Sequence, residues 1–339
     1  MRVFVVNQNA NHNGGTKMNK QQRGIIIVVA LVCLISGFIS GVYIGKSRGI
    51  PFVAKQYRWS IGIYLGKSPF IVSPGDIRNP VLTAKDVTDV PAEFVADPFM
   101  LYENHTWYMF FEVFNKQTRQ GDIGLATSED GLNWTYKQIV LDEFFHLSYP
   151  YVFKWKNDYY MIPETCRANS IRLYKAVGFP TQWSFVGTLL YNGRYADPSI
   201  FHYDGKWWLF AETNRNDILC LYYADNLMGP WIEHPKSPII AGDANIARPG
   251  GRVLVFDDRI VRYTQDDDPT YGNRVRAFEI TKLTTTSYEE KEVSENPILK
   301  PGRTGWNGKG MHHIDPHYTD KNKWIACVDG KGEVFFGLK

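Results

Sequence analysis

Cysteine is scarce in this chain of 339 residues, and acidic residues are absent from its first 58 positions. One of the four cysteines lies in an apolar N-terminal run, which leaves Cys166, Cys220 and Cys327 far apart. An odd number of distant cysteines argues against a disulfide framework and against a zinc site. The acid-free N-terminal part holds eight basic side chains, so the rest of the chain has 30 basic side chains against all 35 acidic ones. A folded part with that net negative charge is a poor candidate for nucleic-acid binding.

Charged residues are also missing between Arg23 and Lys46, a stretch of 22 mainly apolar residues. A helix of this length spans roughly 33 Å, enough to cross a hydrocarbon core of about 30 Å. A cleaved signal peptide is the alternative, but its apolar region covers only about 7–15 residues. The sequence therefore predicts a single-pass membrane protein with its folded domain on the luminal or extracytoplasmic side. The expected parts are a cytosolic tail over residues 1–23, a transmembrane anchor over 24–45, a linker over 46–58 and a domain over 59–339.

Small residues recur within the predicted anchor. Gly37, Gly41 and Gly45 fall at four-residue spacing, which lets two membrane helices approach closely. This stripe is compatible with a homodimer through the membrane. The alternative is that glycine is simply common in membrane helices.

Helical periodicity is absent from the rest of the chain, but a repeat of about fifty residues is present. In the first three of five units a glutamate follows the starting proline at the same spacing, fourteen positions on. Each unit has the pattern of four short strands joined by turns, which predicts an all-β, five-bladed β-propeller of four-stranded blades. The fifth unit ends after its expected third strand at 333–337, so the early run from Trp59 to Tyr64 is expected to close the ring. The prolines that mark the five unit starts are Pro98, Pro150, Pro198, Pro249 and Pro316.

The residue before each proline is predicted to lie at one opening of the central channel, because the innermost strand of every blade lines that channel. The second strand of each blade returns to the same face. Two carboxylates several ångströms apart are what glycoside hydrolysis requires, and crowding raises the pKa of one of them. A turn role is the alternative for Asp-Pro, but a tyrosine and an arginine break the pattern. The pre-proline residues are Asp97, Tyr149, Asp197, Arg248 and Asp315, and the rim residues are Glu112, Glu164, Glu212 and, more loosely aligned, Gln265 and Asp329.

Two other polar clusters give weaker functional predictions than the carboxylates. The histidines around Ile314 resemble a metal cluster, but their spacing favours one imidazole in the pocket, that of His313. Asp266-Asp267-Asp268 is expected to be a solvated turn, because the rest of a calcium loop is missing. No metal and no cofactor are predicted. Arg252, Trp306 and Lys309 are expected to line a sugar or an anionic group.

Asp-Pro blade starts with carboxylates on five four-stranded blades resemble the propellers of glycoside hydrolase families 43 and 32. This resemblance implies that Asp97 is the base or nucleophile and that Asp197 stabilises the transition state. The acid would be Glu164 or Glu212. Pro163-Glu164-Thr165-Cys166 is similar to the Glu-Cys acid motif of family 32 with one residue inserted, whereas Arg248 stands where family 43 enzymes carry a glutamate.

A closer resemblance covers nearly the whole predicted domain. The segments 59–64, 79–83, 86–90 and 94–100 look like the N-terminal propeller domain of plant glucosamine inositolphosphorylceramide transferases, which also occurs in bacterial proteins. In the plant proteins this domain follows a membrane anchor and precedes a glycosyltransferase domain. Because the sequence ends at Lys339, the chain is expected to lack that transferase domain.

The sequence leaves three functions open. The first is a glycosidase-like propeller that acts on a glycan or glycolipid head group, with Arg248 and His313 positioning the substrate. An arginine suits an anionic group such as a phosphate or a uronate. The second is a non-catalytic recognition module that presents a glycan to a partner glycosyltransferase. The third, a purely structural propeller, ranks last because it has little use for a buried ring of charges.

Overall fold

The computed structural model describes residues 20–21, 25, 27–37, 53–213, 216–319 and 323–337. Residues 27–37 are helical. Among the described residues, none of the helices has the length and apolar character needed to cross a bilayer. Part of the anchor predicted over 24–45 lies outside the described residues, including Gly41 and Gly45 of the glycine stripe. Residues 57–334 form one compact unit, and this unit contains the residues that the repeat analysis selected.

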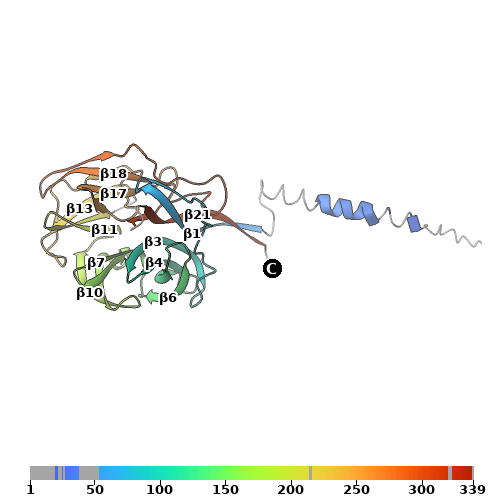
Figure 1. The fold of residues 1–339 in the computed structure, drawn as a ribbon, viewed down its shortest axis with the longest axis horizontal. Coiled ribbons are helices and arrows are strands. Elements are labelled where there is room, and N and C mark those ends of the chain that lie inside the picture. The colour runs from blue at the N-terminus through green and yellow to red at the C-terminus, as the bar shows by residue number, and fades with distance from the viewer. Residues whose placement is uncertain are drawn as a thin grey trace, which may run out of the picture. The chain divides into compact units, whose positions relative to one another are not determined.

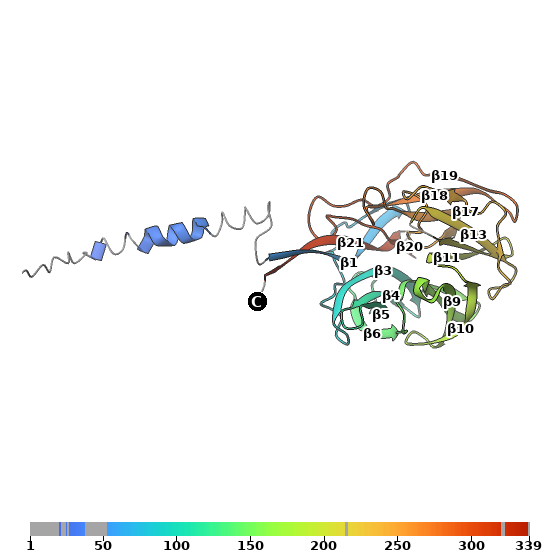
Figure 2. The same cartoon turned by 180° about the vertical axis from the view of Figure 1, so that it is seen from behind.

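This unit is all-β and consists of five antiparallel sheets, the blades of a propeller (Figures 1 and 2). From the innermost strand outward, blade 1 contains β3 (Ala92–Glu103), β4 (Thr106–Asn115), β5 (Gln120–Ser128) and β6 (Thr135–Leu141). Blade 2 contains β7 (Ser148–Trp155), β8 (Asp158–Glu164), β9 (Ser170–Gly178) and β10 (Gln182–Tyr191), with the short 3₁₀ helix η1 (Cys166–Ala168) between β8 and β9. Blade 3 contains β11 (Ala196–Tyr203), β12 (Lys206–Glu212), β13 (Ile218–Ala224) and β14 (Ile232–Glu233), and β15 (Ile240–Ala241) also pairs with β13. Blade 4 contains β16 (Leu254–Phe256), β17 (Arg259–Asp266), β18 (Arg274–Leu283) and β19 (Tyr288–Glu292).

The fifth blade joins the two ends of the propeller. Its order is β20 (Ile314–Tyr318), β21 (Trp324–Gly337), β1 (Val53–Ser68) and β2 (Ile71–Ser73). The blue β1 and the red β21 therefore lie side by side in Figure 1. The predicted closure by residues 59–64 is confirmed. The prediction of a separate third strand at 333–337 is wrong, because these residues continue β21 and the N-terminal segment supplies two strands.

Neighbouring blades pack face to face through apolar side chains that alternate along each strand. The adjacent Trp207 and Trp208 on β12 illustrate this alternation, because both are buried but they belong to different core clusters. Full burial of a large apolar side chain contributes about 1.5–3 kcal/mol to stability. The sheets thereby hold their innermost strands, and the polar residues at the ends of those strands, in fixed positions around the channel.

Candidate functional site

The first three blades share a backbone irregularity at the predicted site. Asp97, Tyr149 and Asp197 have φ values of 52°, 46° and 47°, in the left-handed region that non-glycine residues rarely adopt. Each lies where the pairing of the first two strands shifts register. Such strain persists only where the surrounding structure holds it, and it is concentrated at functional sites.

The glutamates of the repeat lie directly beside these bulges. Glu112, Glu164 and Glu212 pair with the residue that precedes each strained position. All three glutamates are buried. In blades 1 to 3 the pre-proline residues and the glutamates of the second strand therefore lie next to each other, as predicted.

The fifth blade follows a different register from the one that its Asp-Pro pair suggested. Asp315 pairs with Cys327, two residues before Asp329, just as Phe99 pairs with Phe110, two residues before Glu112. Asp315 therefore corresponds to Phe99 and not to Asp97. The expectation that Asp315 belongs to the ring of pre-proline residues is wrong, because the repeat is displaced by two residues in this blade.

Asp97 faces two histidines of the fifth blade. Its Oδ1 lies 3.8 Å from His312 Nε2 and 3.9 Å from His313 Nδ1. On the other side of the His312 ring, Nδ1 lies 2.7 Å from Asp329 Oδ2, and Trp59 stacks on the ring with centroids 3.9 Å apart. Asp329 also accepts hydrogen bonds from the backbone N–H groups of Asp97, His312 and His313, each at 3.1 Å. Asp329 thus holds the strained Asp97 backbone and one of its imidazole neighbours together.

Burial and neighbouring charges give these groups different pKa values. Burial raises the pKa of Asp97 to about 7, although His312 acts in the opposite direction. Burial disfavours the charged imidazole of His312, but Asp329, Asp97 and Asp267 together outweigh burial and raise the pKa of His312 to about 9. Burial lowers the pKa of His313 to about 4, so this fully buried ring is neutral near pH 7.

Two buried glutamates have raised pKa values. Burial, reinforced by Asp97, raises the pKa of Glu112 well above its usual value. Burial, reinforced by Asp197, does the same for Glu164. Carboxylic acids that stay neutral near pH 7 can donate a proton to a leaving group.

His146 borders Glu112, and the repeat analysis missed it. Gly121 N–H donates to its Nδ1 at 2.8 Å, so the ring proton is on Nε2, which lies 3.6 Å from Glu112 Oε1. Burial lowers the pKa of His146 to about 4. A neutral imidazole thus directs an N–H group at this carboxyl. The sequence offers only a weak signal for this residue, a histidine in the loop before the second blade.

Asp197 is held by two side chains. Arg248 Nε donates to its Oδ2 at 2.6 Å and Nη2 to its Oδ1 at 3.4 Å, and Gln265 Nε2 donates to Oδ2 at 2.5 Å. Arg248 also contacts Glu164, with Nη2 3.5 Å from Oε2, and donates to Asn216 Oδ1 at 2.8 Å. The charge of the guanidinium is therefore balanced by the Asp197 carboxylate.

A cavity of about 320 Å³ opens beside this ion pair. It is polar, and its walls come from blades 2, 3 and 4. Glu212 lies in its wall, with Oε1 accepting a hydrogen bond from the Asn216 backbone N–H at 2.9 Å. The lining residues are Glu164, Cys166, Arg194, Ala196, Glu212, Thr213, Asn216 and Arg248.

Several residues predicted to bind substrate are engaged elsewhere. Arg252 Nε donates to Asp315 Oδ1 at 2.6 Å, and the same arginine donates to the carbonyl groups of Val152 and Met100 at 3.0 and 3.2 Å. Asp315 is fully buried and also accepts hydrogen bonds from the Met100 N–H at 2.6 Å and from His317 at 2.9 Å. We name Arg252 and Asp315 the axial ion pair, because its partners connect blades 1, 2, 4 and 5. Trp306 is half-buried and packs against the core cluster between blades 4 and 5.

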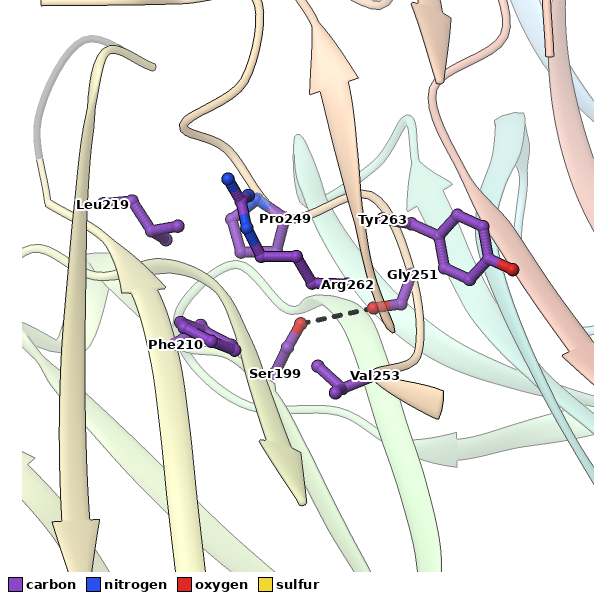
Figure 3. A pocket seen from close by; sticks show the side chains of 8 residues that line it. All are labelled: Ser199, Phe210, Leu219, Pro249, Gly251, Val253, Arg262 and Tyr263. Atoms are coloured by element: carbon purple, nitrogen blue, oxygen red, sulfur yellow. Dashed lines mark hydrogen bonds between the residues drawn. The ribbon is translucent and has the colours of Figure 1, made fainter. Parts of the chain in front are cut away.

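Tyr149 also serves the packing of the blades. Its hydroxyl group lies 2.9 Å from Ser199 Oγ, donates to Gly251 O at 2.9 Å and accepts the Gly251 N–H at 2.7 Å. Figure 3 shows Ser199 and Gly251 facing each other where blades 3 and 4 meet, and the space there holds no room for a ligand. Tyr149 is fully buried, so its phenol is a structural link rather than an open ligand group.

One group of residues has the composition of a metal site. Ligand atoms of Asp97, His312 and Asp329 lie within 4.8 Å of one another. Two carboxylates and one imidazole would suit a divalent cation. In this structure the imidazole of His312 already lies between the two carboxylates as their counter-charge.

Comparison with known proteins places the chain among carbohydrate-related sequences. The family model described as "Glucosamine inositolphosphorylceramide transferase 1, N-terminal" matches residues 54–331. The chain is 40% identical over 296 residues to glucosamine inositolphosphorylceramide transferase 1 of Oryza sativa subsp. japonica, covering 80% of this chain and 40% of that protein. It is 36% identical over 305 residues to the Arabidopsis thaliana protein of the same name, covering 82% of this chain and 40% of that protein. The chain thus spans about 40% of the length of these relatives.

The fold is also similar to that of a solved glycosyl hydrolase from Bacteroides ovatus. The TM-score is 0.56 at 12% identity, and the match covers 78% of this chain and 92% of that one. At this identity the likeness concerns the fold alone.

Proposed function

The chain belongs to the family of the N-terminal domain of glucosamine inositolphosphorylceramide transferase 1, and from this premise we propose that it is a glycosidase-like propeller that acts on a glycan or glycolipid head group. One observation carries the proposal. Buried carboxyl groups with separated protonation states gather at one face of the channel, with Glu112 and Glu164 held protonated while the pKa of Asp97 is about 7. Groups whose environments push their pKa values apart are suited to acid–base chemistry.

In this proposal Asp97 is the base or nucleophile, and Glu164 or Glu112 is the general acid. Asp97 suits the first role because its carboxylate faces two imidazoles and ionises near neutral pH. Glu164 suits the second because it lines the 320 Å³ cavity and resists ionisation. Asp197 holds Arg248 and Gln265, so its role is to position neighbouring groups. Glu212 lines the same cavity and would contact the substrate.

A recognition module that assists a partner glycosyltransferase is the second candidate. The Arg248–Asp197 ion pair favours the recognition module. Arg248 hydrogen-bonds to both carboxylate oxygens of Asp197, an aspartate that was expected to take part in catalysis. In that case the carboxyl groups bind sugar hydroxyl groups without breaking a bond.

The proposal includes a membrane setting. The anchor over residues 24–45 would hold the propeller on the luminal or extracytoplasmic side, with a homodimer through Gly37, Gly41 and Gly45. A glycolipid substrate would then lie in the same membrane. A partner glycosyltransferase would act on the same head group.

Turnover by the full-length chain tests the enzymatic proposal. We would purify the chain in detergent, offer it a panel of glycans and glycolipids, and compare Asp97→Asn, Glu164→Gln and Glu112→Gln. Asp97→Asn should reduce kcat about 100-fold or more, and so should the glutamine variant of whichever glutamate is the general acid. General acid and base groups each contribute about 10²–10⁴-fold. The matched control is Asp225→Asn, since Asp225 is exposed and pairs with Lys206.

The pH dependence provides a second readout. Turnover should rise as pH increases toward about 7, because Asp97 must lose its proton to act as a base. Asp97→Asn should remove this rising limb. Glycan binding without turnover by the unaltered chain, weakened in the carboxyl variants, would instead establish the recognition module.

A further inference from the structure

Two arginines beside the candidate site form no ion pair within the described residues. Arg194 lines the cavity that contains Glu164 and Glu212, and both Arg167 and Arg194 line the adjoining cavity. Arg167 lies in η1, and Arg194 lies in the loop between β10 and β11. Both are exposed, and within the described ranges no carboxylate oxygen lies within 4.0 Å of either guanidinium. By contrast, three less exposed arginines each have a carboxylate oxygen at 2.6 Å, namely Arg248, Arg252 and Arg262. Arg194 hydrogen-bonds to the Cys166 side chain and is attracted by Glu164, but neither arginine forms an ion pair within the described residues. Both guanidinium groups can therefore still attract an anion.

Short-range contacts fix the two loops that carry these arginines. The Gly193 N–H donates to the carbonyl of Asn169 at 3.2 Å, which ties the loop before β11 to the end of η1. The Thr165 hydroxyl group donates to Ser170 O at 2.6 Å and closes the base of the η1 loop. A site held in place before binding loses less conformational entropy when a ligand arrives.

The space between the arginines is continuous with the candidate active site. A cavity of about 400 Å³ is lined by Cys166, Arg167, Asn169 and Arg194. Its walls share Cys166 and Arg194 with the 320 Å³ cavity that contains Glu164 and Glu212. We name this outer cavity the arginine subsite.

The arginines of this subsite influence the protonation of neighbouring residues. Arg167 contributes, after burial, to the lowered pKa of His146, the imidazole beside Glu112. Glu164, which lines the inner cavity, is held protonated by its burial. An anion in the outer cavity would therefore face two guanidinium groups, with Glu164 in the adjoining inner cavity.

We propose that the arginine subsite binds an oxyanion, either a phosphate or a carboxylate, carried by the glycan whose neighbouring sugar enters the carboxyl-lined cavity. Guanidinium groups bind such oxyanions through paired, charge-assisted hydrogen bonds. Arg194 borders both cavities and would orient the substrate between them. The inference rests on the proposed function and narrows its substrate to anionic glycans or glycolipid head groups.

Calorimetric titration of the full-length chain in detergent tests the subsite. The probes are myo-inositol 1-phosphate and methyl glucuronide, with myo-inositol and methyl glucoside as their neutral counterparts. Each anionic probe should bind about 10-fold more tightly than its neutral counterpart, which is the gain expected from one charge-assisted contact. Arg167→Ala and Arg194→Ala should each lose most of this preference, and the double variant should lose all of it.

Arg119→Ala is the matched control. Arg119 is an exposed arginine in the corresponding loop of blade 1 and contacts Glu93 at 3.5 Å, so its removal should leave the preference unchanged. All three substituted positions are exposed, and unchanged thermal unfolding will verify the fold. Equal affinity for charged and neutral probes, or a preference that survives in the double variant, would overturn the subsite.

The source of the anion and the enzymatic proposal are tested separately. Because the proposed anchor would hold the chain in any vesicle, the readout is competition: vesicles that contain phosphatidylinositol should displace myo-inositol 1-phosphate from the reconstituted chain if the anion belongs to a lipid head group, whereas phosphatidylcholine vesicles should not. Binding of the soluble probe that phosphatidylinositol does not reduce assigns a free glycan. Anion preference without turnover on any glycan leaves the subsite in place and rejects the glycosidase, whereas turnover of neutral glycans without anion preference rejects the subsite alone.

Discussion

Blades 1 to 3 and blades 4 and 5 form the channel face in different ways. In blades 1 to 3 a non-glycine residue before proline adopts a left-handed conformation, and a glutamate lies beside it. In blade 4 the residue with a positive φ is instead a glycine, Gly251, with φ of 148°. In blade 5, β20 pairs with β21 without a register shift. The first group of blades presents carboxyl groups, and the second supplies most of the cations that balance them.

This difference between the blades gives the acidic residues of the repeat their cationic partners. Arg248 of blade 4 pairs with Asp197 of blade 3, and His312 of blade 5 lies between Asp97 of blade 1 and its own Asp329. A ring of five equal carboxylates would repel itself. Departure from the repeat in two blades therefore stabilises the charges that the other three blades bring together.

Removing the cation of the axial ion pair is expected to have the largest effect on stability. Arg252→Met removes the guanidinium from the fully buried Asp315 and leaves only His317 and the Met100 N–H beside it, which should cost about 3–5 kcal/mol of the free energy of unfolding. Urea unfolding followed by tryptophan fluorescence measures this. Lys206→Met is the control, since its exposed ion pair with Asp225 contributes little. A loss no larger than that of the control would show that the axial ion pair does not join the blades, whereas Arg252→Met/Asp315→Leu should regain part of the loss.

Placing a side chain at Gly251 should have the next largest effect. A Cβ atom there would lie 1.8 Å from the carbonyl oxygen of Ile314, so blades 4 and 5 would have to separate. Gly251→Ala should therefore cost about 2–4 kcal/mol. Gly75→Ala is the matched control, because Gly75 has φ of 52° but nothing within 4 Å of its Cβ position. That variant should cost only about 1–2 kcal/mol through backbone strain alone, and equal losses would contradict a role of Gly251 in the contact between blades.

The charge of His312 should produce the smallest effect, visible in the pH dependence of stability. Its pKa is about 9 in the folded chain and near 6.5 when unfolded, so its stabilisation is complete below pH 6.5 and is lost as pH rises through 9. Asp97, with a folded pKa of about 7, is largely ionised in both states above that pH. The raised pKa values of Glu112 and Glu164 also make stability fall as pH rises, so the contribution of His312 is the part of the decline that its substitution removes. The free energy of unfolding should fall by about 1–3 kcal/mol between pH 7 and 9.

His312→Gln should reduce this decline, whereas the same substitution at the exposed His105 should leave it in place. Urea titrations at pH 7, 8 and 9 provide the comparison. A decline that persists unchanged in His312→Gln would mean that the imidazole is not the counter-charge of the acidic rim.

The repeat was sufficient to predict the architecture and the acidic rim. Glu112, Glu164 and Glu212 could be assigned to one face because a fixed spacing within each unit follows from local strand and turn geometry. The same reasoning misplaced Asp315, because its blade departs from the common register. His146 and Asn216 could not be found in this way, since neither holds a repeated position.

The sequence by itself determined that this chain forms five similar sheets and that acidic residues recur at their inner edge. Strand period, turn residues and the alternation of apolar side chains act over a few residues and can be found in any one unit. Only the tertiary structure decided which carboxyl groups stay protonated, that Arg248 pairs with Asp197, and that Arg167 and Arg194 line one cavity. These properties depend on burial and on distances between residues that the chain places in different blades, and Coulomb interactions and desolvation change steeply with both.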